Sequence, residues 1–265
     1  MSIEKGGIQL QTPADKKTLS SVTNTLKVLR LFSWKQPELS FTEIKEQLQL
    51  PKSSTHRYIS ALVENGLLSK NPKTNHYRLG LSILSLGGAV FRHNELYMEA
   101  LPIMEELSQE IDETVHICFM ENNKVVYLFR VEGSEPDRLV TQIGRTNPVH
   151  STSEGLSILA FQPESYINSF LKQNFTAYTK HTLTTPNEIL TELKTIREQD
   201  YCLLDSAFFE NYMSIAVPIR DYTEDVVASL SVIGQSARMM QKDIDYLVPT
   251  LKEAAEDISE HLGYY

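Results

Sequence analysis

The chain has 265 residues, of which 41% are hydrophobic and 22% are charged, a composition typical of a globular protein with room for two domains. It contains no apolar run of the roughly 20 residues that a membrane-spanning helix needs, and its first residues lack the apolar core of a signal peptide, so we expect no membrane association. The two cysteines, Cys118 and Cys202, have no CxxC spacing, which favours a reduced, cytoplasmic chain without a disulfide.

The net charge of −9 is distributed unevenly along the chain. Residues 1–93 contain 13 Lys and Arg against 6 Asp and Glu, a net charge of +7, whereas residues 94–265 contain 12 against 28, a net charge of −16. An asymmetry of this size indicates a basic, nucleic-acid-binding part joined to an acidic body. The acidic body should repel DNA and confine its contact to the basic part.

Residues 1–17 combine Gly-Gly, Pro13 and mixed charges, and we expect them to form a disordered arm. Residues 18–32 follow with a helical period. Their apolar side chains share one predicted face, which we expect to pack on the next two helices; they are Val22, Leu26, Leu29 and Phe32.

Two short helices separated by a tight turn are predicted next. The first covers residues 42–48 with Thr42 as its N-cap, and Pro51 ends it and opens the second. The second helix places Thr55, Ile59 and Leu62 on a buried stripe and ends at Gly66. Small hydroxyls and one guanidinium then face outward, a surface suited to base edges, while Lys52 at the helix N-terminus suits a phosphate.

Residues 67–70 and 76–79 read as two strands around a basic turn at residues 71–75, the wing of a winged helix-turn-helix. We therefore predict double-stranded DNA as the partner, with two alternatives: a small helical domain with a polar face, and a winged helix that docks protein. The predicted DNA-binding residues are Lys52, Ser53, Ser54, His56, Arg57, Ser60, Lys73, Thr74, Asn75, His76 and Arg78.

Residues 81–111 are predicted to be helical with a break at residues 91–94. The first part presents Leu81, Leu84 and Leu86 beside Gly87-Gly88-Ala89, a surface that another helix could approach closely. We interpret residues 81–95 as a linker that orients the DNA-binding part. The alternative is an ordinary helical hairpin that covers the second domain.

The remaining chain alternates between strand and helix patterns. Strands are predicted at residues 114–120, 124–132, 139–143, 201–205, 214–220 and 226–232, with tight turns at residues 122–123 and 223–225. Helices are predicted at residues 153–161, 163–172, 186–199 and 241–262. Strand pairs joined by tight turns, with helices on a face, indicate an α+β fold with an antiparallel sheet.

The segment LPKSSTHRYISALVENGLLSKNPKTNHYRLG resembles the DNA-binding part of the IclR (isocitrate lyase regulator) family of bacterial transcription factors. The segments ETVHICFMENNKVVYLFRVEG, PVHSTSEGLSILAF and VVASLSVIGQSARM are similar to that family's effector domain. The resemblance implies a winged helix-turn-helix at residues 18–80, a linker at 81–95 and a GAF-like effector-binding domain at 96–265. It also implies a homodimer or homotetramer on a pseudo-palindromic operator, frequently as a repressor.

The predicted effector site departs from the family pattern. Leu156 follows Gly155 where the family commonly has Lys, and Ile233 replaces a serine, so we expect an aromatic or largely apolar acid as the small organic effector. A Glu154 carboxylate in the first turn of its helix would oppose an anionic ligand unless it points to solvent. A degenerate pocket is the alternative. The predicted effector-binding residues are His150, Ser153, Glu154, Gly155, Leu156, Leu204, Asp205, Ser214, Ser231 and Ile233.

Enzyme chemistry is not expected. The chain has no G-x-S-x-G elbow, no HExxH, no G-x-G-x-x-G and no P-loop, and its histidines have no ligand-like spacing. We therefore predict no catalytic residue, no metal and no cofactor.

Overall fold

The computed structural model describes residues 20–33, 36–92, 95–134 and 142–264. The predicted arm at residues 1–17 lies outside them, as does most of the strand predicted at residues 139–143. The chain folds into two compact units, residues 1–93 and residues 94–265. Within the described residues, none of the helices combines the length and the apolar content that crossing a bilayer requires.

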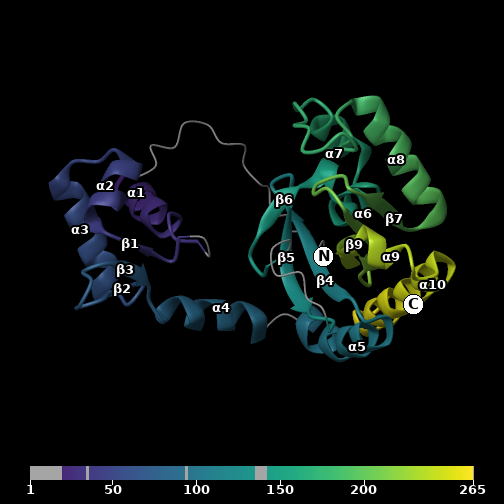
Figure 1. The fold of residues 1–265 in the computed structure, drawn as a ribbon, viewed down its shortest axis with the longest axis horizontal. Helices are drawn as coiled ribbons and strands as arrows, with labels where there is room; N and C mark the ends of the chain where they lie inside the picture. Colours follow the sequence, from purple (N-terminus) through teal and green to yellow (C-terminus); the bar gives the residue numbers. More distant parts are fainter. Residues whose placement is uncertain (1–19, 34–35, 93–94, 135–141, 265) are drawn as a thin grey trace, which may run out of the picture. The chain divides into compact units, whose positions relative to one another are not determined.

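The first unit is a helical bundle with a small antiparallel sheet (Figure 1). The strand order is β1-β3-β2, in which β2 and β3 form the predicted hairpin and β1 adds a third strand. Its elements are α1 (Ser20–Leu29), β1 (Glu38–Leu39), α2 (Phe41–Leu48), α3 (Lys52–Glu64), β2 (Leu68–Lys70), β3 (Tyr77–Leu79) and α4 (Ser82–Arg92).

Capping interactions set where α2 begins and where α3 ends. The predicted N-cap Thr42 is wrong: α2 begins one residue earlier, and Ser40 caps it in a capping box with Glu43. Gly66 ends α3 as predicted, with a φ of 68°, because the amides of Gly66 and Leu67 bond back to Val63 and Leu62 in a Schellman motif. The chain then turns directly into β2.

The core of the first unit corrects one prediction about α1. Thr55, Ile59 and Leu62 of α3 are buried as predicted, and Val28 and Phe32 pack with them. Val22 and Leu26, however, are 53% and 51% exposed. Because α1 cannot turn both the side with Val22 and Leu26 and the side with Val28 toward the small core, the side with Val28 enters it, together with Phe32, which follows the helix.

The second unit contains a six-stranded antiparallel sheet with the order β6-β5-β4-β9-β8-β7. Five predicted strands are present, whereas β6 lies just after the stretch predicted at residues 139–143, whose described end at Ile143 is a turn. The strands are β4 (Thr114–Glu121), β5 (Lys124–Val131), β6 (Thr146–Pro148), β7 (Cys202–Asp205), β8 (Tyr212–Arg220) and β9 (Val226–Gln235).

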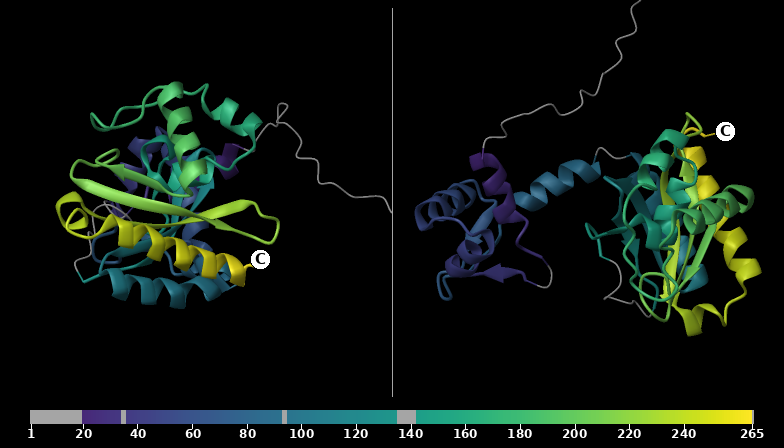
Figure 2. Two further views of the ribbon diagram at one scale, coloured as in Figure 1. Left: turned by 90° about the vertical axis from the view of Figure 1, so that its right-hand side faces the viewer. Right: turned by 90° about the horizontal axis from the view of Figure 1, so that it is seen from above.

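Helices cover both faces of this sheet (Figure 2). On one face, α5 (Glu95–Ile111) and α10 (Ile244–His261) lie side by side, and on the other, α6 (Ser153–Leu159) packs on the central strands beneath α7 (Glu164–Phe170) and α8 (Pro186–Gln199). Two short elements, the 3₁₀ turn η1 (Val149–Ser151) and α9 (Ser236–Met239), were not predicted. Residues of the core between sheet and α6 include Cys118, Tyr127, Leu156 and Leu159.

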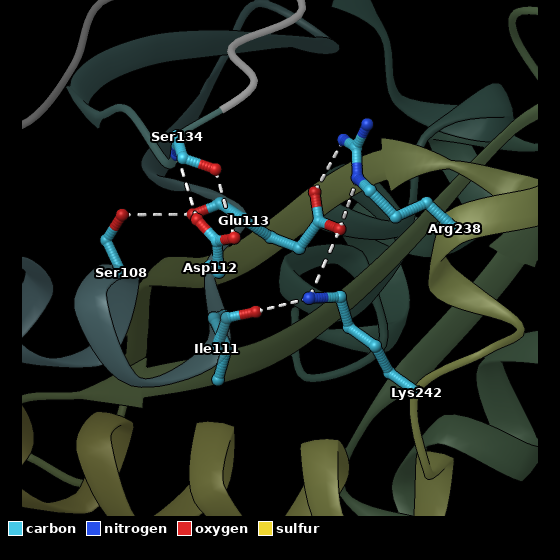
Figure 3. A network of polar contacts seen from close by, with 7 residues as sticks. All are labelled: Ser108, Ile111, Asp112, Glu113, Ser134, Arg238 and Lys242. Atoms are coloured by element: carbon cyan, nitrogen blue, oxygen red, sulfur yellow. Dashed lines mark hydrogen bonds and ion pairs between the residues drawn. The ribbon is translucent and has the colours of Figure 1, made fainter.

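A buried ion pair joins Glu113, just after α5, to Arg238 of α9 (Figure 3). The Glu113 side chain is 1% exposed, and its two oxygens accept from Arg238 Nε and Nη2, both at 2.7 Å. Lys242 Nζ lies 3.6 Å from Glu113 and donates to the Ile111 carbonyl at 2.6 Å. Two segments far apart in sequence are thus joined by opposite charges, and each charge offsets part of the cost of burying the other.

Candidate functional site

The outward surface of α3 carries the side chains predicted to contact DNA. Lys52, Ser53, His56 and Arg57 are exposed, and the opposite side is buried through Tyr58 and its neighbours. Ser54 and Ser60, the remaining predicted contacts on α3, are half-buried. A helix anchored on one side and polar on the other can enter a groove without losing its own packing.

The N-terminus of α3 leaves its first amides without a side-chain cap. Pro51 occupies the N-cap position and offers no acceptor, while Lys52 is exposed beside it. A helix of 13 residues with free first-turn amides and an adjacent cation suits a phosphate oxygen.

The wing is a rigid turn rather than a loose loop. Asn71 accepts from the Lys73 amide at 2.9 Å and donates its own amide to the His76 carbonyl at 2.8 Å. Asn75 adopts a left-handed conformation with a φ of 60°. The predicted contacts Lys73, Thr74 and Asn75 are therefore exposed at a fixed tip, and of the two on the strand side His76 is half-buried and Arg78 exposed.

Arg78 lies on the face of the wing rather than at its tip. Its Nε donates to Ser69 Oγ on the neighbouring strand at 3.1 Å, which holds an exposed guanidinium across the hairpin. The first unit thus presents cations on both α3 and the wing.

In the second unit, a small cavity of about 30 Å³ lies between the sheet and the segment that joins β7 to β8. Its walls are aromatic and aliphatic, and its polar atoms come from an amide, hydroxyls and one carboxylate. The lining residues are Tyr127, Asn147, Ser151, Thr152, Glu154, Leu204, Ala207, Phe208, Phe209, Tyr212, Met213, Ser214 and Ile233.

A buried polar network forms the floor of this cavity. Glu154 is 1% exposed, and its Oε1 accepts from Ser231 Oγ at 3.1 Å and from Tyr127 Oη at 3.4 Å. Ser153 Oγ lies 3.4 Å from Glu154 Oε2 and 2.8 Å from Ser214 Oγ, and Asn147 Nδ2 donates to Tyr127 Oη at 3.2 Å. Burial raises the pKa of Glu154, and hydrogen bonds from its own backbone amide and from the three hydroxyls only partly offset that effect.

The structure brings some of the predicted effector residues together and separates others. Glu154, Leu204, Ser214 and Ile233 line the cavity. Ser153 and Ser231 lie behind it, bonded to Glu154. The others are placed elsewhere: Gly155 and Leu156 are buried in α6, Asp205 accepts from the hydroxyls of Ser206 and Ser236, and His150 lines an adjoining cleft.

The adjoining cleft has a volume of about 460 Å³ and shares Asn147 and Phe208 with the cavity. His150 lines it with its ring 5.1 Å from that of Phe175 and its Nε2 3.0 Å from the Thr176 carbonyl, and burial lowers the pKa of the imidazole. Lys124 and Arg145 also line the cleft, so its charge differs in sign from that of the cavity.

The aromatic wall of the cavity was missed by sequence reasoning. Phe208 and Phe209 lie with ring centroids 4.5 Å apart in the segment between β7 and β8, and Tyr127 comes from β5. An adjacent pair of phenylalanines in a connecting segment is the signal that could have identified that segment, because such rings are seldom left in water without a ligand or partner.

Comparison with known proteins finds matches for both units of the chain. Residues 88–260 match the family model "Bacterial transcriptional regulator IclR C-terminal", and residues 21–72 match "IclR helix-turn-helix domain". The chain is 34% identical to the HTH-type transcriptional regulator KipR of Bacillus subtilis, over 92% of this chain and 97% of that one.

Solved structures of IclR proteins have the same fold as this chain. The crystal structure of the Thermotoga maritima IclR matches with a TM-score of 0.77 and 27% identity, covering 93% of this chain and 100% of that one. An IclR homolog from Microbacterium hydrocarbonoxydans, complexed with 4-hydroxybenzoate, matches with a TM-score of 0.81 and 27% identity over 92% of this chain and 99% of that one.

Proposed function

Because the chain belongs to the IclR family of bacterial transcriptional regulators, we propose that it represses its target genes by binding an operator through α3 and the wing, and that a small effector modulates that binding. The chain is a DNA-binding regulator with a C-terminal effector-binding domain, and it is not an enzyme. We propose the sign of regulation, the residues that contact DNA and the class of the effector.

The single observation that supports the DNA contacts is the division of α3 into a buried and a polar side. Thr55, Ile59 and Leu62 anchor the helix, and Arg57 projects from the other side. Arg57 has the reach to bond guanine O6 and N7, while Lys73 at the wing tip meets phosphate. The proposed base contact thus comes from α3, and the proposed phosphate contacts come from the wing tip and the N-terminus of α3.

Band shifts with DNA from upstream of the protein's own gene test this assignment. Arg57→Ala should lower specific affinity by about 1–3 kcal/mol, with the loss concentrated at one base position, because a bidentate base contact disappears. A variant that footprints like the wild type would show that Arg57 does not read the operator. Glu64→Ala, on the same helix at its far end, serves as the matched control.

We also propose a homodimer, or a dimer of dimers, formed in part by the first unit. Val22 and Leu26 of α1 are exposed, and at the start of α4 Leu81, Leu84 and Leu86 are 80%, 71% and 61% exposed. Apolar side chains gathered on two helices favour a partner surface. A second copy would align two α3 helices with two operator half-sites, and residues 81–95 would serve as the linker.

The effector is proposed to bind in the second unit, at the cavity and the adjoining cleft. The walls of Tyr127, Phe208, Phe209 and Tyr212 support a ligand with an aromatic or largely apolar body. The homolog complexed with 4-hydroxybenzoate supports the same class. A ligand there changes DNA affinity only if it binds two arrangements of the chain unequally.

A further inference from the structure

Within the proposed effector site, we propose that the effector presents a protonated amine to Glu154, and that this residue selects against ligands that place a carboxylate there. The inference rests on the proposed function of the cavity, and it assigns the chemistry of one end of the ligand. It also revises the expectation of a simple acid, because Glu154 points into the cavity rather than to solvent.

The cavity is lined by one acidic residue and by no basic residue among the described residues. The acidic residue is Glu154. A ligand carboxylate in this position would bring two anions together in a poorly solvated space, which is strongly unfavourable. A cation would instead meet an opposite charge.

The side-chain partners of Glu154 carry no positive charge. The side chains that hydrogen-bond its carboxylate are the neutral hydroxyls of Tyr127, Ser153 and Ser231, at 3.1 to 3.4 Å, and its own backbone amide is a further donor. Nearly complete burial of a carboxylate whose side-chain partners are all neutral hydroxyls is costly. An ammonium group would supply the charge partner and shorter, charge-assisted hydrogen bonds.

Aromatic rings form one wall of the cavity. Phe208 and Phe209 lie edge to face, Tyr212 is 6.4 Å from Phe209, and all three rings line the cavity together with Glu154. Aromatic faces attract ammonium groups. The Arg145 guanidinium, which lines the adjoining cleft, lies 5.3 Å from the centroid of Phe209, a cation–π contact with one ring of this wall.

The size of the two spaces decides how the ligand divides between them. A cavity of about 30 Å³ holds about one or two water molecules, or the terminal group of a ligand, but not a ring. The cleft of about 460 Å³ has room for the body. Its Lys124 and Arg145 suit a negative group at the opposite end of the same ligand.

Calorimetry of the full-length protein with four matched probes tests the inference. The probes are 4-(aminomethyl)benzoate, 4-(hydroxymethyl)benzoate, 4-methylbenzoate and terephthalate, which share the ring and one carboxylate and differ at the other end. We expect the amine to bind at least about tenfold more tightly than the alcohol, and terephthalate to bind most weakly.

Two variants assign the preference to Glu154. Glu154→Gln keeps the size and an acceptor oxygen but removes the charge, and it should abolish the preference for the amine. Asp205→Asn, which changes a nearby carboxylate outside the cavity lining, should retain it. Circular dichroism of each variant establishes that it is folded.

Three results would overturn the inference: an alcohol that binds as tightly as the amine, terephthalate that binds best, or a Glu154→Gln protein with an unchanged preference. If none of the four probes binds at millimolar concentration in protein that still retards its own upstream DNA, the amine assignment fails and the proposed DNA-binding role stands.

Discussion

The buried ion pair between Glu113 and Arg238 supports a quantitative prediction about the second unit. Arg238→Met removes the bidentate partner of a carboxylate that is 1% exposed, while roughly preserving side-chain length. Breaking a buried pair from one side costs about 3–5 kcal/mol, because the remaining charge is left without compensation.

Two features of the structure place the expected loss at the lower end of that range. The Arg238 side chain is 25% exposed, so water already screens the pair in part, and Lys242 stays 3.6 Å from the carboxylate. We therefore expect Arg238→Met to lower the free energy of unfolding of the second unit by about 3 kcal/mol.

Urea unfolding followed by circular dichroism measures this loss, with the transition of the second unit fitted separately because two units need not unfold together. The double variant Glu113→Leu/Arg238→Met provides the control, since it removes both charges and should recover most of the stability. A single variant that loses under about 1 kcal/mol, or a double variant no more stable than Arg238→Met, would refute the reasoning.

Three further predictions concern the wing, α6 and the cavity. Lys73→Ala should weaken DNA binding uniformly across sequences and reduce the slope of log affinity against log salt by about one, as measured by anisotropy in a salt series. Gly155→Ala should cost about 1–3 kcal/mol in urea unfolding, because a Cβ there would lie 2.7 Å from both Val125 Cγ2 and Val149 Cα, whereas Gly87→Ala on α4 meets nothing within 4 Å and should not destabilise. Since burial raises the pKa of Glu154, its folded form binds a proton that the unfolded chain has lost, and stability falls as pH rises from about 4.5 through the pKa of the folded form. Glu154→Gln lacks this loss, so its stability relative to the wild type should grow as pH rises from about 4.5, and a constant difference would contradict the assignment.

Elements with strong local signals were predictable from the sequence. The helix at residues 186–199 has the observed bounds because Pro186 opens it and Thr185 and Glu188 form a capping box. The recognition helix α3 was located by Pro51 and Gly66, and its buried stripe by the period of 3.6 residues. Such signals lie within a few residues of the structure that they determine.

Features that depend on distant residues were not predictable. The inward face of α1 depends on which apolar stripe the small core accepts, and Val22 and Leu26 were assigned to it wrongly. The cavity joins Tyr127, Glu154 and Phe208 from three separate elements, so no spacing in the sequence reveals it. The position of Glu154 in the first turn of its helix is visible in the sequence, but its burial against the hydroxyls of Tyr127 in β5 and Ser231 in β9 follows only from the fold.

Equilibrium binding to DNA tests the central claim most directly. Fluorescence anisotropy would compare a duplex from upstream of the protein's own gene with a scrambled duplex of equal length and composition, at about 0.15 M salt. We predict that the protein binds its own upstream DNA at least about 10³-fold more tightly than the scrambled duplex. Equal affinity for the two duplexes would contradict the conclusion that α3 and the wing read a specific operator.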